Sequence, residues 1–171
     1  MERTIEGTTR LQAPPDRARR VLRDHVEVLL GAQTLADHLH GALGVGPIRH
    51  EIVLSVGQSV DHGNRVVRRL TWEAALHPDR FPVFDGEIAV ELDDGGGAVL
   101  TLRGVYDVPF GTLGRFGDGV AGRRVARHCV AGFLEDVARH LDAAAEPLAA
   151  HEPADRYQVE VVDRGVALAV G

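Results

Sequence analysis

The sequence predicts an α+β domain in which an antiparallel sheet, built as a meander, wraps around a long C-terminal helix. Four segments with the side-chain pattern of strands follow one another through short, turn-forming connections, and short connections force neighbouring strands to be antiparallel. From about Phe116 the apolar spacing widens to every third or fourth residue, the period of one helix face. The positions on that face are Val120, Ala126, Val130, Phe133, Val137 and Leu141. Because such a helix needs an apolar surface to lie on, we expect it to cover the sheet.

The first part of the chain predicts one strand and two short helices. Residues 3–12 alternate between apolar and polar side chains, as a half-buried strand does. Asp16 then begins a helix after two prolines, which fits a helix N-terminus. Its apolar positions are Ala18, Val21 and Leu22. A second short helix is expected at 33–43.

The meander is expected next, followed by a separate tail. Its strands are predicted at 48–58, 65–76, 84–92 and 98–108, with turn-forming residues at 61–64, 77–80 and 93–97. The expected organisation is a domain at 1–145, a Pro-, Ala- and charge-rich linker at 146–156, and a β-hairpin tail at 157–171. The tail would turn at Asp163, Arg164 and Gly165, and dock on an edge of its own sheet or on a second subunit.

Composition excludes several classes of function. The formal net charge is −6, which argues against a general affinity for nucleic acid, because that requires a concentrated positive face. All basic residues are Arg, with abundant Ala, Gly and Val, as is typical of GC-rich bacterial genes. The N-terminus lacks a signal-peptide core, and no window reaches the ~20 apolar residues of a membrane span. We therefore expect a cytoplasmic protein.

The single cysteine, Cys129, falls in the apolar spacing of the long helix and is expected to be buried.

Residues 65–141 carry motifs that resemble a known family. They are a W-x-A strand at Trp72 and Ala74, an FP-x-F-x-G strand entry, a strand from Leu100 to Tyr106, and a P-x-G loop at Pro109 and Gly111. The strand entry consists of Phe81, Pro82, Phe84 and Gly86. On these residues the chain resembles, over about 1–145, bacterial members of the START-related helix-grip (SRPBCC) superfamily, including polyketide-cyclase and lipid-transport-like proteins. The resemblance implies a cavity between a curved sheet and the long helix, which relatives use for lipids, polyketides or hormones and in some cases for catalysis. It brings no catalytic signature to this chain.

Strand phase selects polar side chains that could line such a cavity. His50 is in phase with Ile52 and Leu54, and Arg68 with Leu70 and Trp72, while Tyr106 shares a face with Leu102. An inward Arg68 needs an acidic partner or an anionic ligand, because an unpaired buried charge is costly. The predicted lining is Tyr106, Arg68, His50, Trp72, Phe84, Phe116 and Val120.

Each of these polar candidates also has a structural interpretation. A β-bulge could turn Arg68 outward, a protein carboxylate could pair with it, or it could lie at the sheet rim. His50 could be a hydrogen-bonded structural histidine. Tyr106 could be a core tyrosine bonded to the backbone, and Trp72 a core residue rather than a stacking platform.

No metal, cofactor or catalytic carboxylate pair is expected. His38 and His40 diverge on a helix, and no third ligand follows from the spacing. Glu73, Glu87 and Glu91 are out of phase with their apolar neighbours and should face solvent.

We therefore predict the binding, without catalysis, of a small hydrophobic or amphipathic ligand between sheet and helix. One alternative is a polyketide cyclase or dehydratase-like enzyme using Tyr106, His50 or Arg68. Another is an interaction module with a filled core, dimerising through the tail.

Overall fold

The structure, a computed structural model, describes residues 2–25, 52–74, 83–107, 119–145 and 159–164. Its elements, in chain order, are β1 (Glu2–Leu11), α1 (Pro15–Asp24), β2 (Ile52–Asp61), β3 (Arg65–Ala74), β4 (Val83–Leu92), β5 (Ala98–Asp107), α5 (Gly119–Ala145) and β6 (Val159–Arg164). The α+β class, the order of the strands and the long C-terminal helix are confirmed. The second short helix, expected at 33–43, lies outside the described residues.

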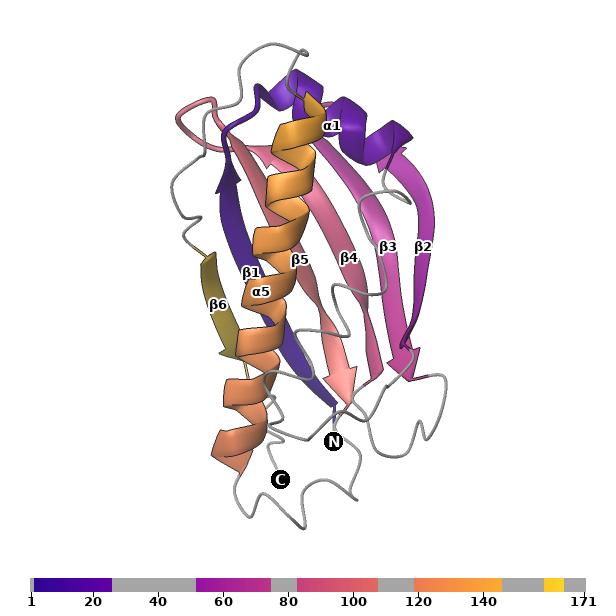
Figure 1. Cartoon of the computed structure of the whole chain (residues 1–171), viewed down its shortest axis with the longest axis vertical. Coiled ribbons are helices and arrows are strands. Elements are labelled where there is room, and N and C mark those ends of the chain that lie inside the picture. The colour runs from indigo at the N-terminus through magenta and orange to yellow at the C-terminus, as the bar shows by residue number, and fades with distance from the viewer. Residues whose placement is uncertain (1, 26–51, 75–82, 108–118, 146–158, 165–171) are drawn as a thin grey trace, which may run out of the picture.

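The strands form one six-stranded sheet in the order β2-β3-β4-β5-β1-β6 (Figure 1). Strands β2 to β5 are sequential antiparallel neighbours, so the predicted meander is confirmed. The first strand returns beside the last strand of the meander, because β1 pairs with β5 along its whole length. This arrangement leaves β2 and β6 as the two edges of the sheet.

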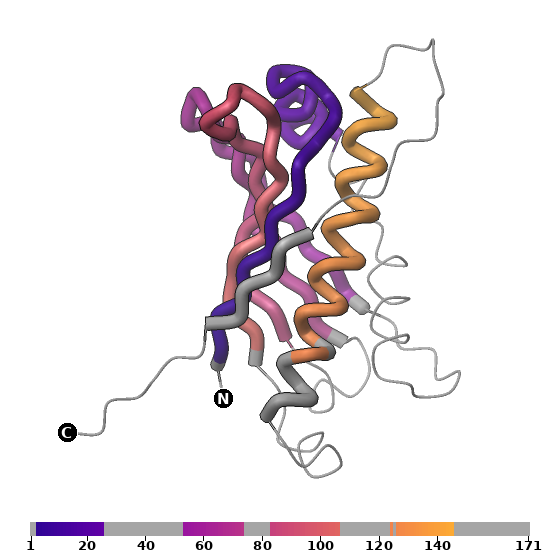
Figure 2. The backbone as a smooth tube through the Cα atoms, turned by 90° about the vertical axis from the view of Figure 1, so that its left-hand side faces the viewer, coloured from indigo at the N-terminus to yellow at the C-terminus, as the bar shows by residue number. Residues whose placement is uncertain are grey.

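Both described helices lie on the same face of the sheet, which we call the inner face. Helix α5 runs along β1, β5 and β6, while α1 crosses one end of β2, β3 and β4 (Figure 1). Seen from the side, the sheet and α5 are two separate layers (Figure 2). The arrangement is that of a helix-grip fold, as the resemblance in sequence implies.

The core lies between these layers and consists largely of residues that the two periodicities select. On α5, Val130, Phe133, Val137 and Leu141 are buried, Ala126 is partly buried against them, and Cys129 is buried as predicted. On α1 the three predicted apolar positions are buried. Burying one such large side chain contributes about 1.5–3 kcal/mol, so this interface holds the layers together.

Three hydrogen bonds fix the C-terminal end of α5 to the start of the chain. The buried Asp142 carboxylate accepts hydrogen bonds from the backbone N–H groups of Gln12, at 3.1 Å, and Ala13, at 2.9 Å. Arg17 on α1 donates to the carbonyl oxygen of Ala145 at 3.3 Å. An Arg side chain thus satisfies one of the carbonyls that a helix leaves unpaired at its C-terminus.

Strand β2 extends to Asp61, three residues beyond its predicted end at Gln58. The register between β2 and β3 shifts between Val56 and Ser59, so that Gly57 and Gln58 together lie opposite Arg69. This β-bulge absorbs the extra residue and lets the strand continue. It also moves Val60 to the outer face, where it is 52% exposed.

The tail differs from its prediction where the turn was expected. Asp163 and Arg164 belong to β6 and pair with Ile5 and Thr4 of β1, so a turn at these residues is wrong. The tail therefore adds a strand to the edge of its own sheet. The rest of it, 165–171, lies outside the described residues. The hairpin and the division into domain, linker and tail stay predictions.

Candidate ligand-binding site

One aromatic residue from each of three neighbouring strands meets in a single row across the inner face. Trp72 on β3 lies opposite Phe84 on β4, and Phe84 lies opposite Tyr106 on β5. All three side chains are buried. The row therefore brings together residues from three of the sequence motifs that support the family resemblance.

Two glycines make room for this row. Gly86 on β4 and Gly104 on β5 are register partners. A Cβ atom on either glycine would lie only 2.6 Å from the ring atom Cζ of Phe84. Since real Cβ atoms do not approach other atoms so closely, the glycines are needed for the Phe84 ring to lie flat against the sheet.

Trp72 connects the row to the helix layer. Its ring stacks on Phe84 with centroids 4.0 Å apart and planes 11° apart, and it meets Phe133 of α5 at 5.9 Å and 57°. We call Trp72, Phe84, Tyr106 and Phe133 the aromatic layer. Trp72 is 6% exposed, yet its indole Nε1 has no hydrogen-bond partner. A buried indole N–H normally finds one.

The inner face is less completely covered at β2. Leu54 lies opposite Trp72, and Val56 opposite Leu70. Both β2 side chains pack on the core but are only partly buried, whereas Trp72, Leu70 and Phe84 are buried. The aromatic layer thus adjoins apolar surface that the described residues do not seal.

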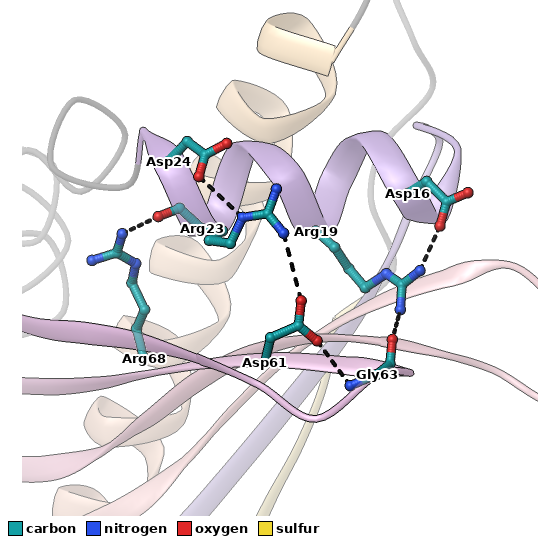
Figure 3. Close-up of polar contacts among 7 residues, drawn as sticks. All are labelled: Asp16, Arg19, Arg23, Asp24, Asp61, Gly63 and Arg68. Atoms are coloured by element: carbon teal, nitrogen blue, oxygen red, sulfur yellow. Dashed lines mark hydrogen bonds and ion pairs between the residues drawn. The ribbon is translucent and has the colours of Figure 1, made fainter.

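Arg68 lies elsewhere on this face, under the C-terminal end of α1. Its side chain is buried, and it donates from Nε to the carbonyl oxygen of Leu22 at 2.8 Å and from Nη1 to that of Gly57 at 2.9 Å. Its Nη2 donates to the carbonyl oxygen of Arg23 (Figure 3). Three backbone carbonyls of the described residues thus accept hydrogen bonds from this charge. The bulge that sequence analysis considered is present, but on β2, where it presents Gly57 to Arg68.

An exposed ion pair and a hydrogen bond reinforce the same contact between α1 and the turn joining β2 to β3 (Figure 3). Arg23 lies 3.5 Å from the Asp61 carboxylate, and Arg19 donates to the carbonyl oxygen of Gly63. The hydrogen bond from Arg23 lowers the pKa of Asp24. Because four residues of strand span ~13 Å, this polar end is well separated from Trp72.

The remaining predicted lining residues are not placed by the structure. His50 and Phe116 lie outside the described residues, and Val120 lies on α5 with its side chain undescribed. The spacing of apolar residues predicts that Leu54 and Phe133 face the interior, but it does not place them at the site. Only the strand register and the packing of α5 show that they adjoin Trp72.

Neither the three glutamates considered from the sequence nor the single cysteine supplies an acid, base or nucleophile at the aromatic layer. Glu73 is exposed, and Glu87 and Glu91 lie on the outer face, as their phase predicts. The guanidinium group of Arg65 lies 2.5 Å from the Glu87 carboxylate and 3.6 Å from that of Glu91. Burial raises the pKa of Cys129 to about 12, so its thiol stays protonated and is a poor nucleophile. No group of three or more metal-ligating side chains occurs within the described ranges.

The outer face of the sheet also carries a groove, of about 460 Å³, across β2, β3 and β4. Its lining includes Val60, His62, Arg65, Arg69 and Glu87. Arg65 forms an ion pair with Glu87 at 2.5 Å, and Arg69 forms one with Asp85 at 2.7 Å. The groove is therefore lined by charged side chains that pair with one another, in contrast to the apolar inner face.

Comparison with known proteins yields likenesses in structure but none in sequence. No family model matches the chain, and no curated protein matches it. A conserved protein from Geobacillus kaustophilus is similar in structure, with 11% identity, 82% of this chain and 96% of that chain covered, and a TM-score of 0.47. The Zhui aromatase/cyclase from Streptomyces shows 15% identity, coverage of 85% and 97%, and a TM-score of 0.42. Ginseng major latex-like protein 151 from Panax ginseng shows 11% identity, coverage of 86% and 99%, and a TM-score of 0.33. No conclusion about function follows from likenesses at this level.

Among the described helices, none combines the length and the apolar character that a membrane span needs.

Proposed function

We propose that the chain binds a small hydrophobic or amphipathic molecule between the inner face of the sheet and α5, without catalysing a reaction. The proposed lining is the aromatic layer together with Leu54 and Val56. His50, Phe116 and Val120 remain proposed lining residues from the sequence. For Arg68, the three carbonyl contacts support a structural role, and contact with ligand is the lesser part of the proposal.

The observation that supports this function best is the unsatisfied indole of Trp72. An unpaired donor in an apolar interior costs about 1–3 kcal/mol, and a solid core has no reason to keep one where Phe would pack. The donor belongs to the row that adjoins the partly exposed β2 side chains. A bound molecule would cover that apolar surface and could also reach the indole.

The proposal also covers the cellular location of the protein and its binding partners. We propose a cytoplasmic protein that uses neither nucleic acid nor membrane insertion, in keeping with its net charge of −6. A homodimer through the tail is also proposed. Since β6 pairs with β1 of its own chain, such a dimer would exchange β6 between copies or add to its free edge.

Native mass spectrometry of the purified protein tests ligand binding directly, by showing whether a small molecule co-purifies. Titration with the amphipathic dye 1-anilinonaphthalene-8-sulfonate provides a second test. Trp72 is the only tryptophan, so intrinsic fluorescence reports on this site alone. We expect saturable quenching of Trp72 at a stoichiometry of one dye per chain.

A matched pair of variants locates the binding. Leu54→Asp, which puts a charge beside Trp72, should abolish quenching, while Val53→Asp, on the outer face of the same strand, should preserve it. No co-purifying molecule and no saturable quenching would show that the space between the layers is filled.

A further inference from the structure

Four buried side-chain polar atoms in the described residues lack a hydrogen-bond partner: Thr9 Oγ1, Arg19 Nε, Arg65 Nε and Trp72 Nε1. Arg19 and Arg65 donate through other nitrogens of the same guanidinium group. Thr9 lies in a row with Leu100 and Val90, both fully buried, away from the aromatic layer. Of these four atoms, only Trp72 Nε1 is an unpaired donor within the aromatic layer, and it is also the only one beside the partly exposed side chains of β2.

The chemistry around Trp72 selects the kind of group that could meet this donor. The indole nitrogen donates and cannot accept, and the ring contacts in the structure are to Phe84 and Phe133. A hydroxyl on a ligand would bring a second donor, and the two described rings that contact the indole, Phe84 and Phe133, offer it no acceptor. A carboxylate would bring a charge into apolar contacts, at a large desolvation cost. A carbonyl oxygen accepts only and is neutral, so it matches the site.

We infer that the molecule bound between the sheet and α5 carries a neutral carbonyl oxygen, as a ketone, ester or amide, on an apolar body, and that this oxygen accepts a hydrogen bond from Trp72 Nε1. The inference rests on the proposed function, because it specifies the ligand of that same site. A hydrocarbon of equal shape would fill the same space but would leave Trp72 Nε1 without a hydrogen-bond acceptor.

Two probes of the same shape separate these cases: 2-acetylnaphthalene, which carries a carbonyl oxygen, and 2-isopropenylnaphthalene, which has a CH₂ group in its place. Dissociation constants for both are measured on the wild-type chain, on Trp72→Phe, and on Val53→Ser as an outer-face control. The comparison between variants cancels the different water solubility of the probes. We expect Trp72→Phe to reduce the preference for the ketone about 5- to 10-fold, the size of one buried hydrogen bond, and Val53→Ser to leave it unchanged.

A second readout does not depend on any variant. The single tryptophan gives one indole N–H resonance in a ¹H–¹⁵N spectrum. The ketone should move its proton downfield, as hydrogen bonding does, and the alkene should not.

If both probes bind, but the preference is the same in Trp72→Phe and the indole proton does not respond to the ketone, the carbonyl inference is overturned and ligand binding stands. If neither probe binds the wild-type chain, the proposed function fails, and the inference with it.

Discussion

Arg68 and Trp72 lie on the same strand and the same face, four residues apart, and both are buried. They differ in the hydrogen bonding of their polar atoms. Arg68 donates to three backbone carbonyls, from Leu22, Arg23 and Gly57. Trp72 has one donor and no acceptor for it. The same face of β3 thus carries a satisfied buried charge at one end and an unsatisfied neutral donor at the other.

This difference indicates a structural role for one end of β3 and a ligand-binding role for the other. At the α1 end, Arg68 on β3 donates hydrogen bonds to α1 and β2 and so holds three backbone segments together. At the aromatic end, a side chain that packs as part of the core retains a polar atom that the core does not use. Buried polar groups cost free energy unless they are paired, so the unpaired one is the better indicator of a binding site. Substitutions at each end of β3 test this contrast.

Arg68→Met should give the largest effect. The variant keeps an apolar stem of similar length but leaves the carbonyls of Leu22, Gly57 and Arg23 without this donor. We expect the free energy of unfolding to fall by about 3–4 kcal/mol, measured by urea denaturation. Arg69→Met is the control, because Arg69 is on the opposite face with its side chain 70% exposed, and it should change stability little. Equal effects in the two variants would contradict the structural role of Arg68.

Asp142→Ala should be the next most destabilising. It removes the acceptor of the Gln12 and Ala13 N–H groups, which join the end of β1 to α5. We expect a loss of about 2–3 kcal/mol, with faster amide hydrogen exchange at the C-terminal end of α5. Glu135→Ala on the same helix is the control, and it should leave both measurements close to wild type. Normal exchange in Asp142→Ala would show that packing alone fixes this helix end.

Gly104→Ala tests how the aromatic layer is seated. The new Cβ would lie 2.6 Å from Phe84 Cζ and from the carbonyl oxygen of Asp85, so ring and backbone must shift. We expect a loss of about 1–3 kcal/mol, typical of overpacking, and a shift in Trp72 fluorescence because Trp72 stacks on Phe84. Gly95→Ala, whose Cβ would meet its nearest atom at 3.4 Å, should have almost no effect. An unchanged spectrum in Gly104→Ala would mean that the glycines do not set the ring position.

The elements of the fold could be predicted because their signals are local. A two-residue period gives the strands, a three-to-four-residue period gives α5, and short connections require antiparallel pairing. The inward positions Leu70, Trp72, Leu102 and Tyr106 follow from phase alone, and all four are buried.

The site could be predicted only in part, because its defining contacts are between distant segments. Phase places Trp72 and Tyr106 on one face, but only the register of β3, β4 and β5 puts them in one row with Phe84. The bulge at Gly57 is not visible in a pattern of apolar residues, and without it the acceptors of Arg68 could not be identified. No local rule specifies that an indole remains unpaired.

Trp72→Phe should have the smallest effect on stability, and it gives the clearest comparison with Arg68→Met. Phe keeps an aromatic ring for stacking and removes a donor that makes no hydrogen bond in the unliganded chain. The volume lost destabilises the protein, while removal of the unmet N–H stabilises it, so we expect a net change below about 1 kcal/mol in urea denaturation. A loss as large as that of Arg68→Met would mean that the indole N–H is paired in the folded chain. In that case the contrast between the two ends of β3, and the binding site inferred from it, would both be lost.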